Sequence, residues 1–519
     1  MFEGENHREK ILVLLTMCFA LFMAMLDNTV VNVALPTLSR ELGADVSGLQ
    51  WIVDGYVLAF ASLLLTGGIL GDRYGRKRMF LLGLGIFTVS SLLCGLSDST
   101  SQLIAARALQ GIGAALLMPG TLSIISVTFP PHERAKAIGF WAGVSGLALA
   151  LGPTLGGWMV ENVGWESVFF LNVPIGIAGL IVGWRVVKES RAELARRLDF
   201  GGLAFGTAGL FALTYSLIEA NEKGWSDPAI VTALGLGVAL LVAFVLWERR
   251  TDHAMMPLSY FRIPAFSAGN AVAFAVSLGM FGIFFFLSLY MQVIRGYSPL
   301  QTGVRFLPMT LMIIVTAPNA GRFASKHGSR GIITFGLTLA AAGMLTLSRM
   351  TVTTPFGLIL PVFMFMGVGM ASVMSPMTAA VMNAVGAERA GLGSATTNTS
   401  REVGGVFGIA LLGTLLTTKL KASMTVAIAG IGISGAQSGA IIEAASHGRI
   451  DRSILTGLTP EQMSAVHTSF AGAFMDGFRL ALMLASIVLF AAAVVANRFI
   501  PSGAPAREHA PEAIPLEVG

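Results

Sequence analysis

The stretch GGILGDRYGRKR occupies residues 67–78 and connects two apolar blocks, at 47–70 and 79–97. Its glycines allow a helix to end and the chain to turn sharply. Asp72 can interact with the end of a neighbouring helix, and the four basic residues hold the turn at a membrane surface. We predict a short turn between two membrane helices. Taken alone, its basic cluster is explained by positive-inside charge as well as by a gating role.

The same stretch recurs in the second half of the chain. Seven of its positions match residues 321–330 at a constant offset of 253, and residues 133–135 match 388–390 at an offset of 255. The chain therefore contains two copies of one unit in the same orientation. Parallel six-helix halves are a common transporter plan, with the substrate site near the midplane where the halves meet.

Apolar blocks of roughly 20 residues extend on both sides of this turn, and a helix of that length crosses about 30 Å of hydrocarbon. The chain is 54% hydrophobic and 12% charged, whereas soluble domains carry about 25% charged residues. We predict an all-α polytopic membrane protein with fourteen transmembrane helices. The blocks cover 11–35, 47–70, 79–97, 102–124, 136–160, 168–187, 203–219, 229–247, 266–290, 300–319, 331–349, 356–377, 393–417 and 471–496.

The repeat divides these helices into two parallel halves, helices one to six and nine to fourteen, with helices seven and eight inserted between them. We expect an N-terminal bundle at 1–200, two inserted linker helices at 201–250, a C-terminal bundle at 251–500 and a cytoplasmic tail at 501–519. The C-terminal bundle includes a long outer loop, 418–470, with local helix or hairpin.

The distribution of Lys and Arg predicts the orientation. If the N-terminus is cytoplasmic, 22 of the 34 basic residues fall on the inner side, 8 on the outer side and 4 within apolar blocks. Such a bias predicts both termini inside. If residues 424–445 crossed the membrane, the C-terminus would lie outside instead.

Several classes of function are excluded or disfavoured. Cys18 and Cys94 lie inside apolar blocks and suggest neither a disulfide framework nor a metal pair. The phosphate-binding pattern GxxxxGK[ST] does not occur. No nucleophile, base and orienting group can be placed together, so we do not expect an enzyme. We expect no metal, cofactor, nucleotide or nucleic acid, and energy from an ion gradient or from the solute itself.

The pattern G-x-L-x-D-R-x-G-R-K within residues 67–78 resembles the motif between helices two and three of the major facilitator superfamily. Further stretches resemble that family's buried-arginine motif, its antiporter motif and the first helix of its fourteen-helix drug:proton antiporter branch. In that order, these residues are Arg107, Gln110, Gly111 and Gly113; Gly152, Pro153, Gly156 and Gly157; and Leu26, Asp27, Thr29, Val30, Val31, Asn32, Ala34 and Pro36.

The resemblance implies a multidrug efflux transporter of the bacterial cytoplasmic (inner) membrane, which we expect to be a monomer. It implies a gating role for Gly68, Asp72, Arg73, Gly75, Arg76 and Lys77. It also implies that the glycine-rich fifth helix seals the halves against leakage. The chain departs from the family pattern at Glu166, where a basic residue is usual, and at Ser325, which replaces the acid in the second copy of the turn. We therefore expect Asp72 alone to act as the cytoplasmic switch.

Three charged residues in the first half fall at similar depth in the outer part of the bilayer. Asp27, Asp54 and Arg107 lie on helices one, two and four. A charge inside a membrane helix costs about 3 kcal/mol or more, so it is a functional candidate. We predict that Arg107 stabilises a carboxylate here and that its movement controls proton binding. The alternative is a static ion pair of Arg107 with one of the two acids.

The second half carries Arg401 and Glu402 about 15 Å into helix thirteen. Adjacent helical residues point in different directions and do not simply neutralise one another. Glu402 is predicted to be a second proton carrier or a countercharge for cationic substrates, and the alternative is that each residue pairs with another helix.

A soft substrate cavity is predicted from residues that adapt to many shapes. These are Trp51, Phe281, Phe285, Tyr290, Met291, Met370, Met374 and Arg401.

We therefore predict a proton-coupled antiporter that exports lipophilic, cationic drugs by alternating access. Its partners are small lipophilic substrates, protons and the lipid bilayer. A second hypothesis changes the cargo to an endogenous metabolite, siderophore or antibiotic. A third, of another class, is a membrane sensor or scaffold that does not transport, although Asp27 and Arg107 argue against it.

Overall fold

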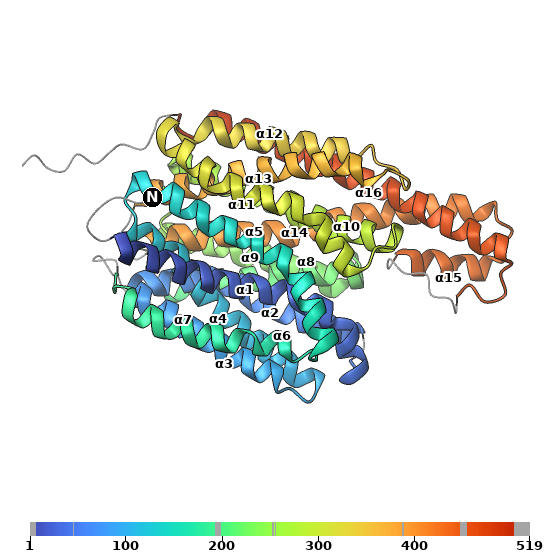
Figure 1. Cartoon of the computed structure of the whole chain (residues 1–519), viewed down its shortest axis with the longest axis horizontal. Helices are drawn as coiled ribbons and strands as arrows, with labels where there is room; N and C mark the ends of the chain where they lie inside the picture. Colours follow the sequence, from blue (N-terminus) through green and yellow to red (C-terminus); the bar gives the residue numbers. More distant parts are fainter. Residues whose placement is uncertain are drawn as a thin grey trace, which may run out of the picture.

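A computed structural model shows the chain as a bundle of long, roughly aligned helices (Figure 1). The structure describes residues 7–44, 46–191, 199–251, 254, 256–386, 389–446 and 454–502, and it contains no strand within them. The first nine helices are α1 (His7–Glu41), α2 (Val46–Tyr74), α3 (Arg76–Gly95), α4 (Thr100–Thr128), α5 (Pro131–Asn162), α6 (Ser167–Phe170), α7 (Asn172–Val186), α8 (Phe200–Lys223) and α9 (Pro228–Arg250). The remainder are η1 (Leu258–Arg262), α10 (Pro264–Leu289), η2 (Tyr290–Ile294), α11 (Pro299–His327), α12 (Ser329–Leu347), α13 (Phe356–Val385), α14 (Ala390–Ala429), α15 (Gly435–Ser446) and α16 (Pro460–Phe499).

The predicted all-α membrane fold is confirmed. Within the described ranges, 13 helical segments are long and apolar enough to cross a membrane, and one of them joins α6 to α7. The segment predicted as the fifth span, α5, is a helix of 32 residues but is not among the 13. The count of fourteen spans therefore stays a prediction.

Helix packing follows the repeat found in the sequence. In the first half α1 packs on α5, α2 on α4, and α3 on both α4 and α7. The corresponding helices of the second half pack in the same way: α10 on α14, α11 on α13, and α12 on both α13 and α16. Between the halves, α5 packs on α11 and α14 packs on α2, so each fifth helix of a repeat contacts the second helix of the other repeat.

The inserted helices α8 and α9 pack on each other, and α8 also contacts α2 and α14. A hydrogen bond of 3.0 Å joins the hydroxyl groups of Thr66 on α2 and Thr207 on α8. Trp225, just after α8, donates from its indole nitrogen to Thr414 on α14. The pair thus lies along the seam between the two halves. The domain limits at residues 200, 250 and 500 stay predictions, and the tail beyond residue 502 lies outside the described residues.

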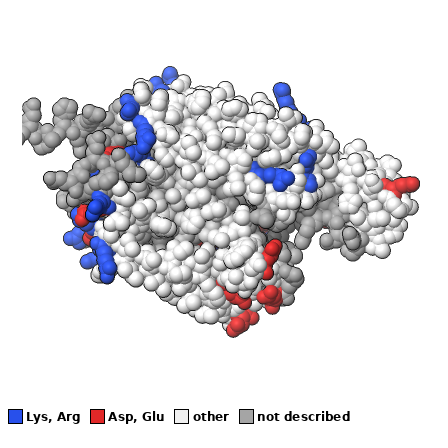
Figure 2. Space-filling model, in the orientation of Figure 1, with Lys and Arg blue, Asp and Glu red and all other residues white. Residues whose placement is uncertain are grey.

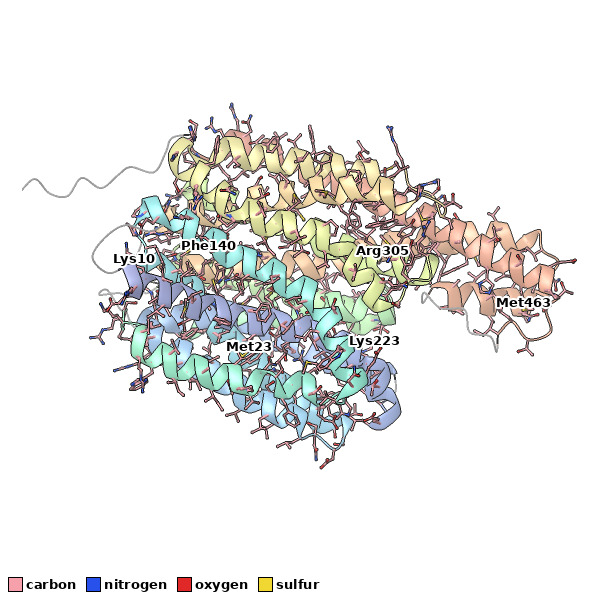
Figure 3. All side chains as sticks on the ribbon, viewed as in Figure 1. Lys10, Met23, Phe140, Lys223, Arg305 and Met463 are labelled. Carbon is pink, nitrogen blue, oxygen red and sulfur yellow. The ribbon has the colours of Figure 1, made fainter. Side chains whose placement is uncertain are left out.

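Charge is concentrated at the ends of the bundle. Figure 2 shows most Lys and Arg at the end that holds the start of α1, while the middle of this face is almost uncharged. Lys10 lies at that end in Figure 3, whereas Lys223 and Arg305 lie toward the other. Large apolar side chains on charge-free stretches of the helices, such as Ile487 of α16 at 64% exposure, are suited to lipid. The orientation in the membrane stays a prediction.

The predicted outer loop, 418–470, is largely helical. α14 continues to Ala429, α15 follows, and α16 begins at Pro460 behind a Thr459–Gln462 capping box. These helices form an extension beyond the bundle, where Met463 is labelled in Figure 3. Residues 424–445 do not form one continuous helix, because a turn separates α14 from α15.

A small apolar core holds this extension together. It is a continuation of the core of the second half, and its members come from all three helices: Met424, Ile428, Ile441, Ala445, Val466 and Phe470. The predicted local helix is thus present, but its bounds could not be predicted because the contacts that bury its apolar faces join segments far apart in the sequence.

Close helix packing in the second half generates a stability prediction. A methyl group at Gly408 on α14 would overlap the Leu278 backbone of α10, whereas one at Gly439 on α15 would meet nothing within 4 Å. We expect Gly408→Ala to destabilise the protein by about 1–3 kcal/mol through overpacking, and Gly439→Ala to leave it unchanged or slightly more stable. Thermal unfolding of both variants in detergent measures the difference. Equal melting temperatures would contradict the packing described.

Candidate functional site

Asp27 and Arg107 form a buried ion pair between α1 and α4. Arg107 Nη1 lies 2.5 Å from Asp27 Oδ2, and neither side chain has exposed surface. Arg107 lies about 10 Å from the start of α4, since a helix rises 1.5 Å per residue. The pair is therefore inside the membrane-spanning part of the first half.

Two amide side chains complete the surroundings of Asp27. Gln110 Nε2 donates to Asp27 Oδ1 at 2.9 Å, and Asn172 Nδ2 donates to the same oxygen at 2.8 Å. Gln110 Oε1 accepts from Arg107 Nη1 at 2.7 Å. Asp27 thus accepts hydrogen bonds from three side chains, a set that suits an ionised carboxylate because a carboxylate only accepts.

The remaining contacts of this site reach the other helices of the first half. Asn172, the first residue of α7, also donates to Ser91 Oγ on α3 at 3.0 Å. Arg107 Nε donates to the Ile52 carbonyl of α2 at 3.1 Å, and the Tyr56 ring lies 4.3 Å from the guanidinium carbon. Helices α1, α2, α3, α4 and α7 therefore meet at one polar cluster.

Arg107 retains one unpaired amino group. Its Nη2 atom is buried and has no hydrogen-bond partner among the described residues. Buried ion pairs add little net stability, but removing one partner costs about 3–5 kcal/mol because the other charge remains buried. Any event that neutralises Asp27 therefore obliges Arg107 to find another partner or to move.

Asp54 is not part of this polar cluster. It is half-buried on α2, and it is not among the partners of Asp27 or Arg107 described above. Tyr56 is the α2 residue whose ring faces Arg107, and residues two positions apart point to opposite sides of a helix. The expected grouping of three charges is therefore reduced to two, and a role for Asp54 in proton coupling stays a prediction.

The turn after α2 is docked on the start of α14. Asp72 accepts hydrogen bonds from the backbone N–H groups of Gly391 and Leu392 at 2.8 and 2.9 Å, and from Arg76 Nη2 at 2.6 Å. Unpaired N–H groups at a helix start favour a negative charge. The carboxylate thus connects the first half to the fifth helix of the second half.

The other residues of the predicted gating motif support this contact. A side chain at Gly68 would overlap Ala395 and the Gly391 carbonyl, so glycine allows α2 and α14 to meet. Gly75 has φ 115°, a conformation that favours glycine. Arg73 and Lys77 are half-buried, and Lys77 Nζ donates to the Trp184 carbonyl at 2.5 Å.

Further contacts between the halves surround the Asp72 contact. Arg134 Nη1 donates to Asn383 Oδ1 at 2.5 Å, and Ser375 Oγ donates to the Ala135 carbonyl at 2.7 Å. Ser394 Oγ on α14 donates to the carbonyl of Pro119 on α4 at 2.9 Å. This end of the molecule is closed by direct contacts between the two halves.

The glycines of the antiporter motif bring α5 close to α1. A side chain at Gly152 would overlap Thr29, and one at Gly156 would meet Val30 at 2.8 Å. Gly157 is half-buried, and the side chain of Pro153 lies outside the described residues. Nearer the start of α5, Gly139 lies against the backbone of α11. The role of this motif in sealing the halves stays a prediction, but α5 does contact both α1 and α11.

The predicted cavity residues fall into three groups. Tyr290, Met291, Met370 and Met374 are buried in the second half, where Tyr290 stacks on Phe478. Trp51 is half-buried beside Tyr215 of α8, and Arg401 is half-buried beside the Trp141 ring of α5. The side chains of Phe281 and Phe285 lie outside the described residues. Their common cavity stays a prediction.

Sequence reasoning missed Asn172 and Ser91 as partners of the buried pair. The exposed fraction is 1% for Asn172 and 0% for Ser91. A buried amide at the start of a helix is a usable signal, because buried polar groups need partners. The sequence could not show that the partner is Asp27, which lies 145 positions earlier.

The profile described as Major Facilitator Superfamily matches residues 17–409. The chain belongs to this superfamily. A Tetracenomycin C resistance and export protein from Streptomyces glaucescens is 36% identical to it, with 97% of this chain and 94% of that protein covered. Multidrug resistance protein Stp of Mycobacterium tuberculosis (strain CDC 1551 / Oshkosh) is 32% identical, with 98% and 97% covered.

Solved structures of the superfamily share the fold at low identity. A proton:xylose symporter, XylE, has a TM-score of 0.64 at 13% identity, with 96% of this chain and 97% of that chain covered. The human organic anion transporter MFSD10 has a TM-score of 0.59 at 16% identity, with 95% and 100% covered. The predictions of a transporter rather than an enzyme, and of an integral protein of the bacterial cytoplasmic membrane, are confirmed.

The contact between Asp72 and α14 generates a test of the closed end. Ser394→Cys places a thiol in the buried contact between α14 and α4. Adding Asp72→Asn removes charge-assisted hydrogen bonds worth about 1.5–3 kcal/mol each, so we expect labelling by an impermeant maleimide in nanodiscs to become at least threefold faster. Adding Arg78→Gln, an exposed residue of the same turn, serves as the control. Equal labelling rates in the two backgrounds would contradict a gate held by Asp72.

Proposed function

We propose that this transporter is a proton-coupled antiporter that exports small lipophilic compounds of the antibiotic or drug type. The observation that supports the proposal most strongly is the fully buried Asp27–Arg107 pair, with Gln110 and Asn172 donating to the same carboxylate. A carboxylate in this position can bind a proton only by losing its best contacts. Proton binding and the arrangement of α1, α4 and α7 are therefore linked.

The proposed cycle uses the two ends of the first half. With Asp27 ionised, Arg107 is neutralised and the end near Asp72 is closed by α14. A proton arriving from the outer side neutralises Asp27, and Arg107 must then move or find another partner. Movement of α4 or α1 acts on α5, which contacts α1, α4 and α11. Each proton that enters down a membrane potential of 100 mV supplies about 2.3 kcal/mol for the export of substrate.

The relatives suggest the cargo. Their names include resistance proteins for methylenomycin A and puromycin as well as the tetracenomycin C exporter. The expectation of cationic drugs rests on Glu402, an acid in the membrane-spanning part of α14. The second hypothesis, export of a compound that the cell itself makes, gains support from the word export in the name of the Streptomyces glaucescens protein. Efflux assays that pair xenobiotic dyes with extracts of the host's own secreted metabolites distinguish these two cargoes.

Asp27→Asn tests the proposed coupling. We expect it to abolish uncoupler-sensitive efflux, because the side chain can no longer gain or lose a proton, while Asp27→Glu retains part of the activity. Efflux of lipophilic dyes from cells is measured with and without an uncoupler. Asp476→Asn, at a carboxylate with 44% side-chain exposure, is the control.

Size-exclusion chromatography and membrane expression establish that the variants fold, since loss of a buried charge partner costs about 3–5 kcal/mol. Full uncoupler-sensitive efflux by folded Asp27→Asn would refute the assignment. If the wild-type protein moves neither dyes nor metabolites in proteoliposomes and exchanges no protons, the sensor or scaffold hypothesis replaces transport.

A further inference from the structure

A second set of charges lies near the middle of the membrane-spanning part of α14. Arg401 and Glu402 are about 17 Å along this helix from its start at Ala390, roughly half of a 30 Å hydrocarbon core. The first turns of α14, residues 390–398, are buried throughout, whereas residues 399–403 are all half-buried. The helix therefore becomes accessible at the level of the two charges.

Arg401 reaches toward the other half of the molecule. Its guanidinium carbon lies 5.9 Å from the centre of the Trp141 ring on α5. Trp141 is itself fixed, because its indole nitrogen donates to Thr121 Oγ1 at 3.2 Å and the ring is 1% exposed. An aromatic face attracts a cation within about 6 Å. This contact orients the guanidinium of α14 toward α5 without using any of its hydrogen-bond donors.

Neither charge is directly neutralised by a hydrogen-bonded or ion-paired group of the described residues, although the two attract each other along the helix. Across the part of the chain that the structure describes, neither Arg401 nor Glu402 makes a hydrogen bond or an ion pair within 4.0 Å. Consecutive residues point about 100° apart on a helix, which keeps the two groups from closing on each other. In the first half, by contrast, Asp27 accepts from three side chains.

Two such groups are costly unless something pairs with them. A charged side chain in the middle of a membrane helix costs about 3 kcal/mol or more. A ligand that carries one charge satisfies one of the groups and is repelled by the other. A ligand that carries both signs a few ångströms apart satisfies both.

We propose that Arg401 and Glu402 form a two-point binding site for amphoteric substrates, which carry an acid and a basic or permanently cationic nitrogen in one small molecule. Arg401 binds the carboxylate or phenolate through its planar fork of donors, and Glu402 binds the cationic nitrogen. Trp141 positions Arg401. The proposal rests on the export function proposed above and narrows its substrate from cationic to amphoteric.

Polar groups beside the pair are compatible with such a ligand. Ser400 precedes Arg401 and lies 3.5 Å from Asn270 Oδ1 of α10. The hydroxyl of Thr399 is buried and has no partner among the described residues. The accessible turn of α14 thus offers neutral hydrogen-bonding groups next to the two charges.

Tetramethylrhodamine and its methyl ester test the proposal, because the two dyes share one ring system. The free acid carries a carboxylate and a delocalised cation, whereas the ester is a cation only. Their binding to the full-length protein in detergent is measured by fluorescence anisotropy, and their proton-driven transport is measured in proteoliposomes.

We expect the acid to bind at least tenfold more tightly than the ester. Arg401→Gln removes this preference by weakening the acid alone, Arg401→Lys retains part of it, and Glu402→Gln weakens both dyes. Arg479→Gln, a half-exposed arginine on α16, leaves both affinities unchanged.

The possible failures are distinct. The amphoteric site is overturned if wild-type protein binds both dyes with equal affinity, or if Arg401→Gln lowers the affinity for both dyes equally. Proton-driven transport of either dye would still support the exporter. Binding without proton-driven transport of either dye counts against the exporter itself and leaves the affinity comparison to decide the site.

Discussion

A charge that lies within the membrane-spanning part of a protein is costly unless it is paired, and the pairing of Asp27 with Arg107 draws in most helices of the first half of this transporter. The two residues belong to α1 and α4, and the groups that complete their hydrogen bonding come from α2, α4 and α7. Helix α3 joins the cluster indirectly, because Ser91 accepts a hydrogen bond from Asn172. The position of each of these helices therefore depends on the charge of one carboxylate. This arrangement is the basis of the proposed proton coupling, because every helix of the cluster is connected to that carboxylate.

The fifth helix of each repeat carries that dependence to the other half. α5 lies against α1 through Gly152 and Gly156 and against α11 through Gly139. Its counterpart, α14, receives Asp72 at its start and carries Arg401 and Glu402 near its middle. A change at Asp27 can thus reach the closed end and the proposed substrate site through helices that are already in contact. The inserted helices α8 and α9 lie along the α2–α14 seam, where a movement of that seam would displace them.

Much of this arrangement could be predicted from the sequence. Apolar block length predicts the helices, the repeat predicts which helices correspond, and the intramembrane charges predict Asp27 and Arg107. The sequence could not show that Asp54 lies outside the hydrogen bonds of this pair, because depth along a helix does not say which way a side chain points, and its role in proton coupling stays a prediction. Asn172 was missed as a partner because Asp27 is distant from it in sequence. The bounds of the helices in the extension could not be predicted because their burial comes from tertiary contacts.

Infrared difference spectroscopy of the protein in lipid, recorded between high and low pH, tests most directly whether Asp27 gains and loses a proton. The account predicts a carbonyl band of a protonated carboxylic acid that is present in the wild-type protein and in Asp476→Asn but is missing in Asp27→Asn. The band should shift in Asn172→Ala, because Asn172 donates directly to the Asp27 carboxylate. An identical set of carboxylic acid bands in wild-type and Asp27→Asn protein would show that Asp27 does not titrate, and would contradict the account.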